Sequence, residues 1–133
     1  MKKRYRIGLG IVAVFAIGIA GLFIRLGVMS SRLDALFQDV ADVTLEGVPD
    51  GTHSGEFKDF LVAVELTVTV ARERITEIEI LRQESGPGYD AAGITERIIT
   101  EQSPRVDVVS GATGSSKAIM IAVTRALDAA ASR

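Results

Sequence analysis

The sequence contains no cysteine. Without thiols a chain forms no disulfide bond, offers no thiolate to a metal ion, has no cysteine nucleophile and carries no acylated cysteine of the lipoprotein type. The sequence also has a single histidine, His53, and no Gly-x-Ser-x-Gly segment. A serine nucleophile would therefore lack a recognisable base, and we do not expect a hydrolase of the catalytic-triad type.

Positive charge is scarce after the first 32 residues. Of the 15 basic residues, six lie in residues 1–32, which contain no acidic residue. The remaining residues hold nine basic against 17 acidic side chains, a formal net charge of −8. An acidic segment without a basic patch argues against nucleic acid as a partner. Anionic lipid headgroups would also repel it, so attachment to a membrane has to come from another part of the chain.

A long apolar run supplies that attachment. Residues 7–24 are eighteen residues without a charge, and as a helix they would span roughly 27 Å, close to the hydrocarbon thickness of a bilayer. The preceding MKKRYR is strongly basic, which predicts a cytoplasmic N-terminus and an exported C-terminal part, hence a single-pass protein of the cell membrane. Small residues at Gly18-Ile19-Ala20 leave a cleaved signal peptide open as the alternative, and both versions export the domain.

The sequence predicts four parts: a cytoplasmic tail (1–6), a transmembrane signal-anchor (7–29), a juxtamembrane linker helix (30–42) and a globular domain (43–133). In the linker, apolar residues recur with helical spacing at Leu33, Leu36, Phe37 and Val40. We expect a spacer helix, with Asp34, Asp39 and Asp42 as solvated charges rather than metal ligands.

A turn is expected near the start of the domain, at Val48–Thr52, because Pro49 and Gly51 favour one. Residues 60–71 then alternate strictly, which predicts a long strand with one face on a core. The residues expected on that face are Phe60, Val62, Val64, Leu66, Val68 and Val70. After a short turn at residues 72–74, a second strand is expected over residues 75–81, so the pair should form an antiparallel hairpin.

Two helices follow in the predicted order. Residues 91–103 have helical spacing with Ile94 and Ile98 inward, and Pro104 ends the pattern. Residues 106–109 read as a short strand, and residues 116–131 as a final amphipathic helix. The fold class expected is therefore α+β: a small antiparallel sheet with two packed helices, preceded by one N-terminal transmembrane helix.

The segment DVVSGATGSSKAI (residues 107–119) is rich in small hydroxyl residues just before the last helix. Such residues commonly cap helices and do nothing more. The first turn of a helix, however, presents unpaired N–H groups and the positive end of its dipole, which together bind phosphate. From the residues alone, a plain cap and a phosphate-ester site both remain open.

The order of motifs from Asp50 to Ala130 resembles the FMN-binding domain family. Residues 50–55 (DGTHSG) are similar to its opening Asp-Gly-Thr-Tyr-x-Gly, with His53 where the family commonly has Tyr. Gln102 and Val106-Asp107 stand where the family has Gln and Val-Asp. Residues 107–115 match its flavinylation signature, Asp-x-x-Ser/Thr-Gly-Ala-Thr-x-Ser.

This resemblance implies an FMN joined to Thr113 by a phosphoester bond, which a flavin transferase installs from FAD. It assigns recognition roles to Asp107, Ser110, Gly111 and Ala112. Ser115 and Ser116 are expected to cap the last helix and to contact the phosphate. Gly88 and Tyr89 belong to a loop that the family places near the flavin ring, and His53 is expected in a solvated turn.

The function expected is electron relay outside the cytoplasm, between membrane or extracytoplasmic redox partners. No second cofactor signature is present, so an electron-transfer protein or a subunit of a redox complex is favoured over a complete enzyme. The alternative is a module that binds FMN or another phosphoryl ligand noncovalently, as a sensor or carrier. A third possibility is an anchored interaction domain without a cofactor.

Overall fold

The structure is a computed structural model, and it describes residues 2–40, 43–85, 91 and 93–133. The chain divides into two compact units, Met1–Arg32 and Leu33–Arg133.

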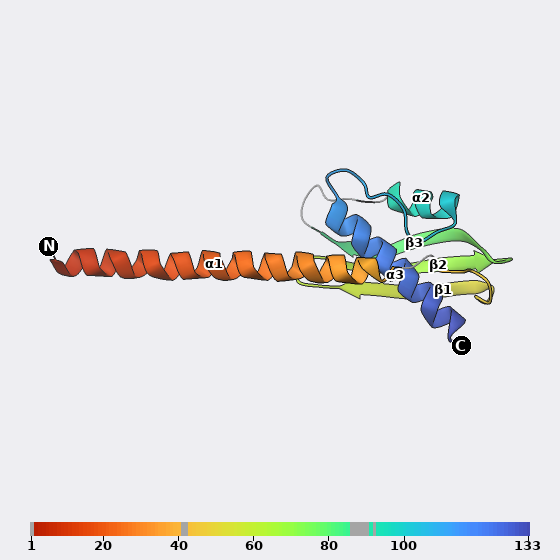
Figure 1. Ribbon diagram of the computed structural model, residues 1–133, viewed down its shortest axis with the longest axis horizontal. Helices are drawn as coiled ribbons and strands as arrows, with labels where there is room; N and C mark the ends of the chain where they lie inside the picture. The colour runs from red at the N-terminus through yellow and green to blue at the C-terminus, as the bar shows by residue number, and fades with distance from the viewer. Residues whose placement is uncertain (1, 41–42, 86–90, 92) are drawn as a thin grey trace. The chain divides into compact units, whose positions relative to one another are not determined.

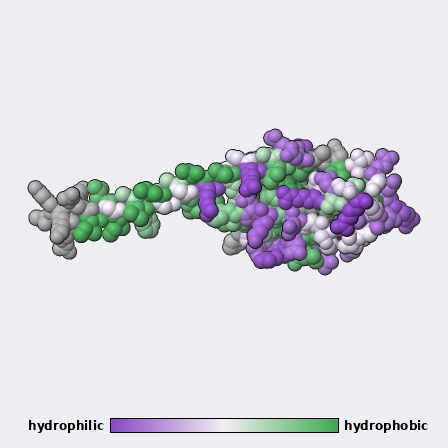
Figure 2. All heavy atoms as spheres, turned by 90° about the horizontal axis from the view of Figure 1, so that it is seen from below, coloured by the Kyte–Doolittle hydropathy of each residue, from purple (hydrophilic) through white to green (hydrophobic). Residues whose placement is uncertain are grey.

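The first unit is helical and belongs to α1 (Lys2–Gln38), which continues into the second unit. From residue 7 to residue 32 its side chains are exposed, apart from partly exposed Leu26 and Met29. Large apolar side chains point to all sides, with Phe15 71% and Ile17 72% exposed, and Figure 2 shows this stretch mostly in green. The helix is long and apolar enough to cross a membrane.

The second unit contains an antiparallel sheet with the strand order β1-β2-β3. Its strands are β1 (Gly51–Lys58), β2 (Ala63–Ala71) and β3 (Arg74–Glu84). Two further helices follow, α2 (Gly93–Glu101) and α3 (Thr113–Ala131). Figure 1 shows this order along the colour gradient, with α3 lying across the strands. The predicted fold class, a small antiparallel sheet with two packed helices, is confirmed.

The core lies between the sheet and α3. The predicted alternation in β2 is confirmed, because Val64, Leu66, Val68 and Val70 are at most 2% exposed. The apolar face of α3 is also buried as expected, at Ile119, Ala122, Val123, Ala126, Leu127 and Ala130. Ile94 and Ile98 of α2 complete this core at 0% exposure. Burial on this scale supplies most of the driving force for folding.

The hairpin of β2 and β3 closes through two residues with positive φ, Arg72 at 53° and Glu73 at 57°. Two such residues make a type I′ turn, whose twist matches that of the flanking strands. Asp50 supports the turn, because its Oδ1 accepts a hydrogen bond of 2.8 Å from the Arg72 N–H. The acidic residue that opens the Asp-Gly-Thr motif therefore has a structural role.

Four expectations about element boundaries are wrong. β1 begins at Gly51 and so includes the end of the segment expected to form a turn; the strand itself is not predicted, because only Gly55 and Phe57 of its eight residues are buried and no apolar alternation marks it. Phe60 was expected in the core but is 47% exposed, since it lies in the turn closed by the Asp59 N–H to Val62 oxygen hydrogen bond. Residues 106–109 pair with no strand. The last helix begins at Thr113 rather than at residue 116.

The end of α1 is part of the second unit. Leu33 is 5% and Val40 2% exposed, and Phe37 is half-buried. The apolar face predicted for the linker helix is therefore packed in this unit, so the segment is more than a spacer. The division of the chain into tail, anchor, linker and domain stays a prediction.

Candidate functional site

The loop of residues 102–112 connects α2 to α3 and contains the first three residues of the Ser-Gly-Ala-Thr motif, whose threonine, Thr113, begins α3. It starts at Gln102, whose φ of 55° ends α2. The Gln102 side-chain amide pairs with the backbone of Ile75: its Oε1 accepts from the Ile75 N–H at 2.8 Å, and its Nε2 donates to the Ile75 oxygen at 2.8 Å. Nε2 also donates to the Ile99 oxygen at 2.6 Å. Gln102 thus fixes the start of the loop to the beginning of strand β3.

The middle of the loop is held from two sides. Arg97 of α2 donates from Nη1 to the backbone oxygen of Asp107 at 2.9 Å and, less closely, to that of Val108 at 3.4 Å. The Val106 side chain is buried, and its N–H approaches the sulfur of Met120 at 3.4 Å. Loop backbone groups that would otherwise need water are therefore satisfied by the two helices.

The end of the loop is a tight turn. The Ala112 N–H donates to the Val109 oxygen at 3.0 Å, and Gly111 has a φ of 81°. Positive φ at the third position of such a turn requires glycine in practice, which explains the glycine of the motif. Ser116 ties the turn to α3: its hydroxyl accepts from the Val109 N–H at 3.0 Å and donates to the Ala112 oxygen at 2.7 Å.

This arrangement corrects the capping roles expected for Ser115 and Ser116. Both lie inside α3 and are buried, at 3% and 0% exposure. The residue at the N-cap is Ala112, whose side chain makes no capping hydrogen bond. Because the helix begins three residues earlier than expected, the Ser116 hydroxyl forms hydrogen bonds with the turn before the helix. It does not accept from the backbone N–H groups that follow it in sequence, as a capping side chain would.

Thr113 is the first residue of α3, and it is exposed. The alanine before it has no side-chain acceptor, so the N-cap side chain does not take the N–H groups of the first turn. An uncapped helix N-terminus is an anion site, because those N–H groups and the helix dipole both favour negative charge. A hydroxyl nucleophile, an exposed position and an anion-binding turn coincide at this residue, and they fit a phosphate ester.

The other predicted site residues fall into three groups. Asp107, Ser110 and Gly111 are exposed in the loop, close to Thr113 in sequence, whereas Ala112, Ser115 and Ser116 are buried beneath it. Gly88 and Tyr89 lie outside the described residues. His53 is not in a turn as expected: it lies in β1, half-buried, with Nε2 2.8 Å from the Pro49 oxygen.

Three basic residues near the loop were missed by the sequence analysis. Arg97 holds the loop carbonyls, and Arg105 and Lys117 both lie over the ring of Phe37, at 5.3 and 5.2 Å from its centroid. Lys117 could have been identified from its spacing, because it lies four residues after Thr113 and residues four apart share a helix face. The two contacts to Phe37 could not be read from the sequence.

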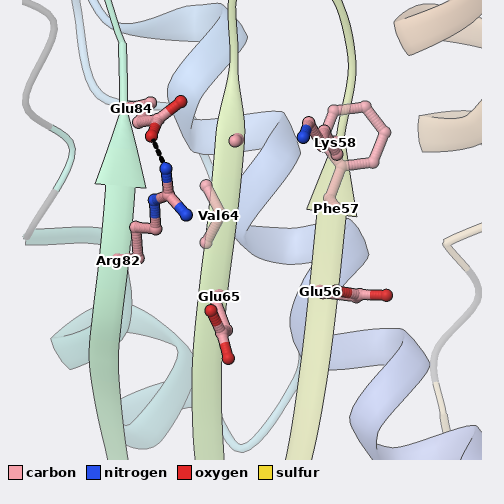
Figure 3. Close-up of a pocket in the computed structure, with 8 residues that line it drawn as sticks. Glu56, Phe57, Lys58, Val64, Glu65, Arg82 and Glu84 are labelled. Carbon is pink, nitrogen blue, oxygen red and sulfur yellow. Dashed lines mark hydrogen bonds and ion pairs between the residues drawn. The ribbon is translucent and has the colours of Figure 1, made fainter.

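The hollows that described residues form in this unit include one beside the loop and one on the sheet. One of about 500 Å³ adjoins the loop and is lined by Phe37, Glu101, Arg105, Val106, Asp107 and Val108. The other, of about 140 Å³, lies on the sheet between Phe57, Val64 and the Arg82–Glu84 ion pair (Figure 3). The described residues that the sequence assigns to the cofactor do not line the second hollow, whereas Asp107 lines the first.

A comparison with protein families gives one match. The family model described as the FMN-binding domain matches residues 62–128. The matched range contains β2, β3, α2, the loop and most of α3, whereas residues 50–55 lie before it. No curated protein matches the chain. The match covers just over half of the 133 residues and includes the loop and Thr113, so the chain belongs to the FMN-binding domain family.

Proposed function

We propose that the chain is a membrane-anchored, extracytoplasmic flavoprotein that relays electrons through an FMN attached to Thr113 by a phosphoester bond. The observation that carries the proposal is the position of Thr113: an exposed, hydroxyl-bearing residue at the start of α3, where the N-cap residue Ala112 makes no side-chain cap. The family match supports FMN as the ligand, and the flavinylation signature favours Thr113 as the point of attachment.

The attachment chemistry balances with FAD as the donor and a flavin transferase as the catalyst. The Thr113 oxygen forms a bond to the phosphorus of the FMN half of FAD. The bond between that phosphorus and the bridging oxygen of the pyrophosphate breaks, and AMP leaves with the hydroxyl proton. The phosphoryl oxygens would carry negative charge and would face the first-turn N–H groups of α3. Those N–H groups and the helix dipole favour an anion at this place.

The protein contributes a rigid support for this ester. The turn before Thr113 is closed by the Ala112 N–H to Val109 oxygen bond and is tied to α3 by Ser116. Arg97 holds the backbone of Asp107 at the other side of the loop. A support whose hydrogen bonds are made before the cofactor arrives loses little entropy when the cofactor is attached.

The bound FMN supplies the redox chemistry, because a flavin accepts two electrons and releases them singly. The chain itself supplies attachment, orientation and electrostatics, and its partners are membrane or extracytoplasmic redox proteins. A covalent bond prevents loss of the cofactor outside the cell. The proposed anchor is residues 7–29, with the basic N-terminus in the cytoplasm and the C-terminal domain on the outer side.

Denaturing gel electrophoresis tests the covalent bond. The full chain is co-expressed with a flavin transferase, beside the variants Thr113→Ala and Ser110→Ala. We expect a fluorescent band for wild type, a weaker band for Ser110→Ala because Ser110 is expected to serve in recognition, and none for Thr113→Ala. A purified protein that is yellow before denaturation but gives no fluorescent band would instead establish a noncovalent binding module. Fluorescence that survives in Thr113→Ala would assign another acceptor.

A further inference from the structure

The end of α1 contacts the first two turns of α3. Lys117 forms an ion pair with Asp34, and its ammonium lies 5.2 Å from the centre of the Phe37 ring. Gly114 faces the same helix, because a Cβ atom placed on it would lie 3.9 Å from Leu33 Cδ2. The Lys117 side chain is only 19% exposed. Its charge is therefore held in a defined place instead of moving freely in solvent.

Lys117 also shares a helix face with the proposed flavin acceptor. Residues four apart on a helix have Cβ atoms about 5–6 Å apart. Side chains on a helix lean toward its N-terminus, so the stem of Lys117 extends toward the turn that begins with Thr113. A phosphate on the Thr113 oxygen would thus lie within reach of the Lys117 ammonium.

The other cations of this region are engaged elsewhere or lie farther along the chain. Arg97 donates to the carbonyl oxygens of Asp107 and Val108, and Arg105 lies over Phe37 with Nη1 3.5 Å from the Val40 oxygen. Arg125, also on α3, is twelve residues after Thr113, which is roughly 18 Å along the helix axis.

We infer that Lys117 is the counter-ion of the FMN phosphate on Thr113 and that the end of α1 holds it in position through Asp34 and Phe37. The inference rests on the proposed function. A phosphate joined to both Thr113 and the ribityl chain keeps one negative charge. The ammonium has three N–H donors, so it serves the Asp34 carboxylate and a phosphate oxygen together. Asp34 competes only weakly with the phosphate for the Lys117 ammonium, because the Asp34 side chain is 53% exposed and its charge is screened by water.

The experiment compares Lys117→Met, which keeps the length of the stem and removes the charge, with Lys117→Arg, which keeps the charge. Lys58→Met is the matched control, because Lys58 is the other lysine after residue 32. Each full chain is purified in detergent, in a buffer without phosphate, and is then incubated with the transferase and FAD. Attachment is followed by mass over time. We expect Lys117→Met to slow attachment about tenfold, and Lys117→Arg and Lys58→Met to stay within about threefold of wild type.

The ³¹P chemical shift of the attached FMN gives a readout that a purely structural role would not move. Each variant is allowed to react to completion, and its shift is compared with that of the same protein unfolded in urea. We expect the wild-type, Lys117→Arg and Lys58→Met proteins to share one shift, and Lys117→Met to move toward the unfolded value. Equal rates and an unchanged shift in Lys117→Met would overturn the inference while leaving the attachment intact. A wild-type chain that accepts no flavin would instead refute the proposed function itself.

Discussion

Gly55 of β1 lies directly against the backbone of Ala122 in α3. A Cβ atom added to Gly55 would overlap the Ala122 carbonyl oxygen and lie 2.9 Å from the Ala126 Cβ. The Gly-Thr-His-Ser-Gly stretch therefore ends in glycine because strand and helix approach too closely for any side chain. This contact positions α3, and with it the helix N-terminus that carries Thr113.

Gly55→Ala should destabilise the domain by about 1–3 kcal/mol or more, because an overpacked side chain must push α3 away from the sheet. Urea unfolding followed by circular dichroism measures the change. Gly93→Ala is the matched control, since a Cβ atom on Gly93 meets nothing within 4 Å. A loss in Gly55→Ala no larger than that in Gly93→Ala would contradict the close approach of strand and helix.

Gln102→Leu should lower the free energy of unfolding by about 2–6 kcal/mol, since it removes the partner of the Ile75 N–H and of the Ile75 oxygen, each worth about 1–3 kcal/mol when left unsatisfied. The effect should be local, so hydrogen exchange at the Ile75 amide should accelerate more than at other amides of β3. Uniform acceleration along β3, or none, would show that the side-chain amide does not hold the loop.

Ser116→Ala should loosen the turn before Thr113. The change removes the acceptor of the Val109 N–H and should lower stability by about 1–2 kcal/mol and slow flavin attachment. Ser132→Ala is the control, because Ser132 donates to the Asp128 oxygen in the same backward geometry but is exposed at the end of α3. If both variants accept flavin at the wild-type rate, Ser116 does not support the site.

Substitutions in the turn between β2 and β3 should make the domain more stable. Arg72 and Glu73 adopt positive φ, which costs a residue with a side chain about 1 kcal/mol relative to glycine. The double variant Arg72→Asn/Glu73→Gly should therefore raise the free energy of unfolding by about 1 kcal/mol, with the Arg72 N–H to Asp50 bond retained. Glu77→Gly, a change in the body of β3, should lower it. A double variant less stable than wild type would contradict the type I′ geometry.

Much of the fold could be predicted from the sequence, because a strand or helix that is buried on one face shows a periodic pattern of apolar residues. The alternation of β2 and the helical spacing of α3 both reflect contact with one core, and both were read correctly. β1 was missed because glycine and phenylalanine are its only buried residues, which is too few to make a pattern.

The site was predictable to a smaller degree. Thr113 was found through a local motif and a family resemblance, because all the residues of that motif are adjacent in sequence. Two contacts of this region join distant positions: Gln102 and Ile75 are 27 residues apart, and Lys117 and Asp34 are 83 apart. Such pairs form only through tertiary packing, which a single sequence does not display.

The central claim is the covalent bond at Thr113, and the intact mass of the full chain tests it most directly. For protein purified from cells that contain the flavin transferase, the account predicts one mass, that of the polypeptide plus one FMN less one water, and the bare polypeptide mass for Thr113→Ala. A wild-type protein that shows only the unmodified mass under these conditions would contradict the account.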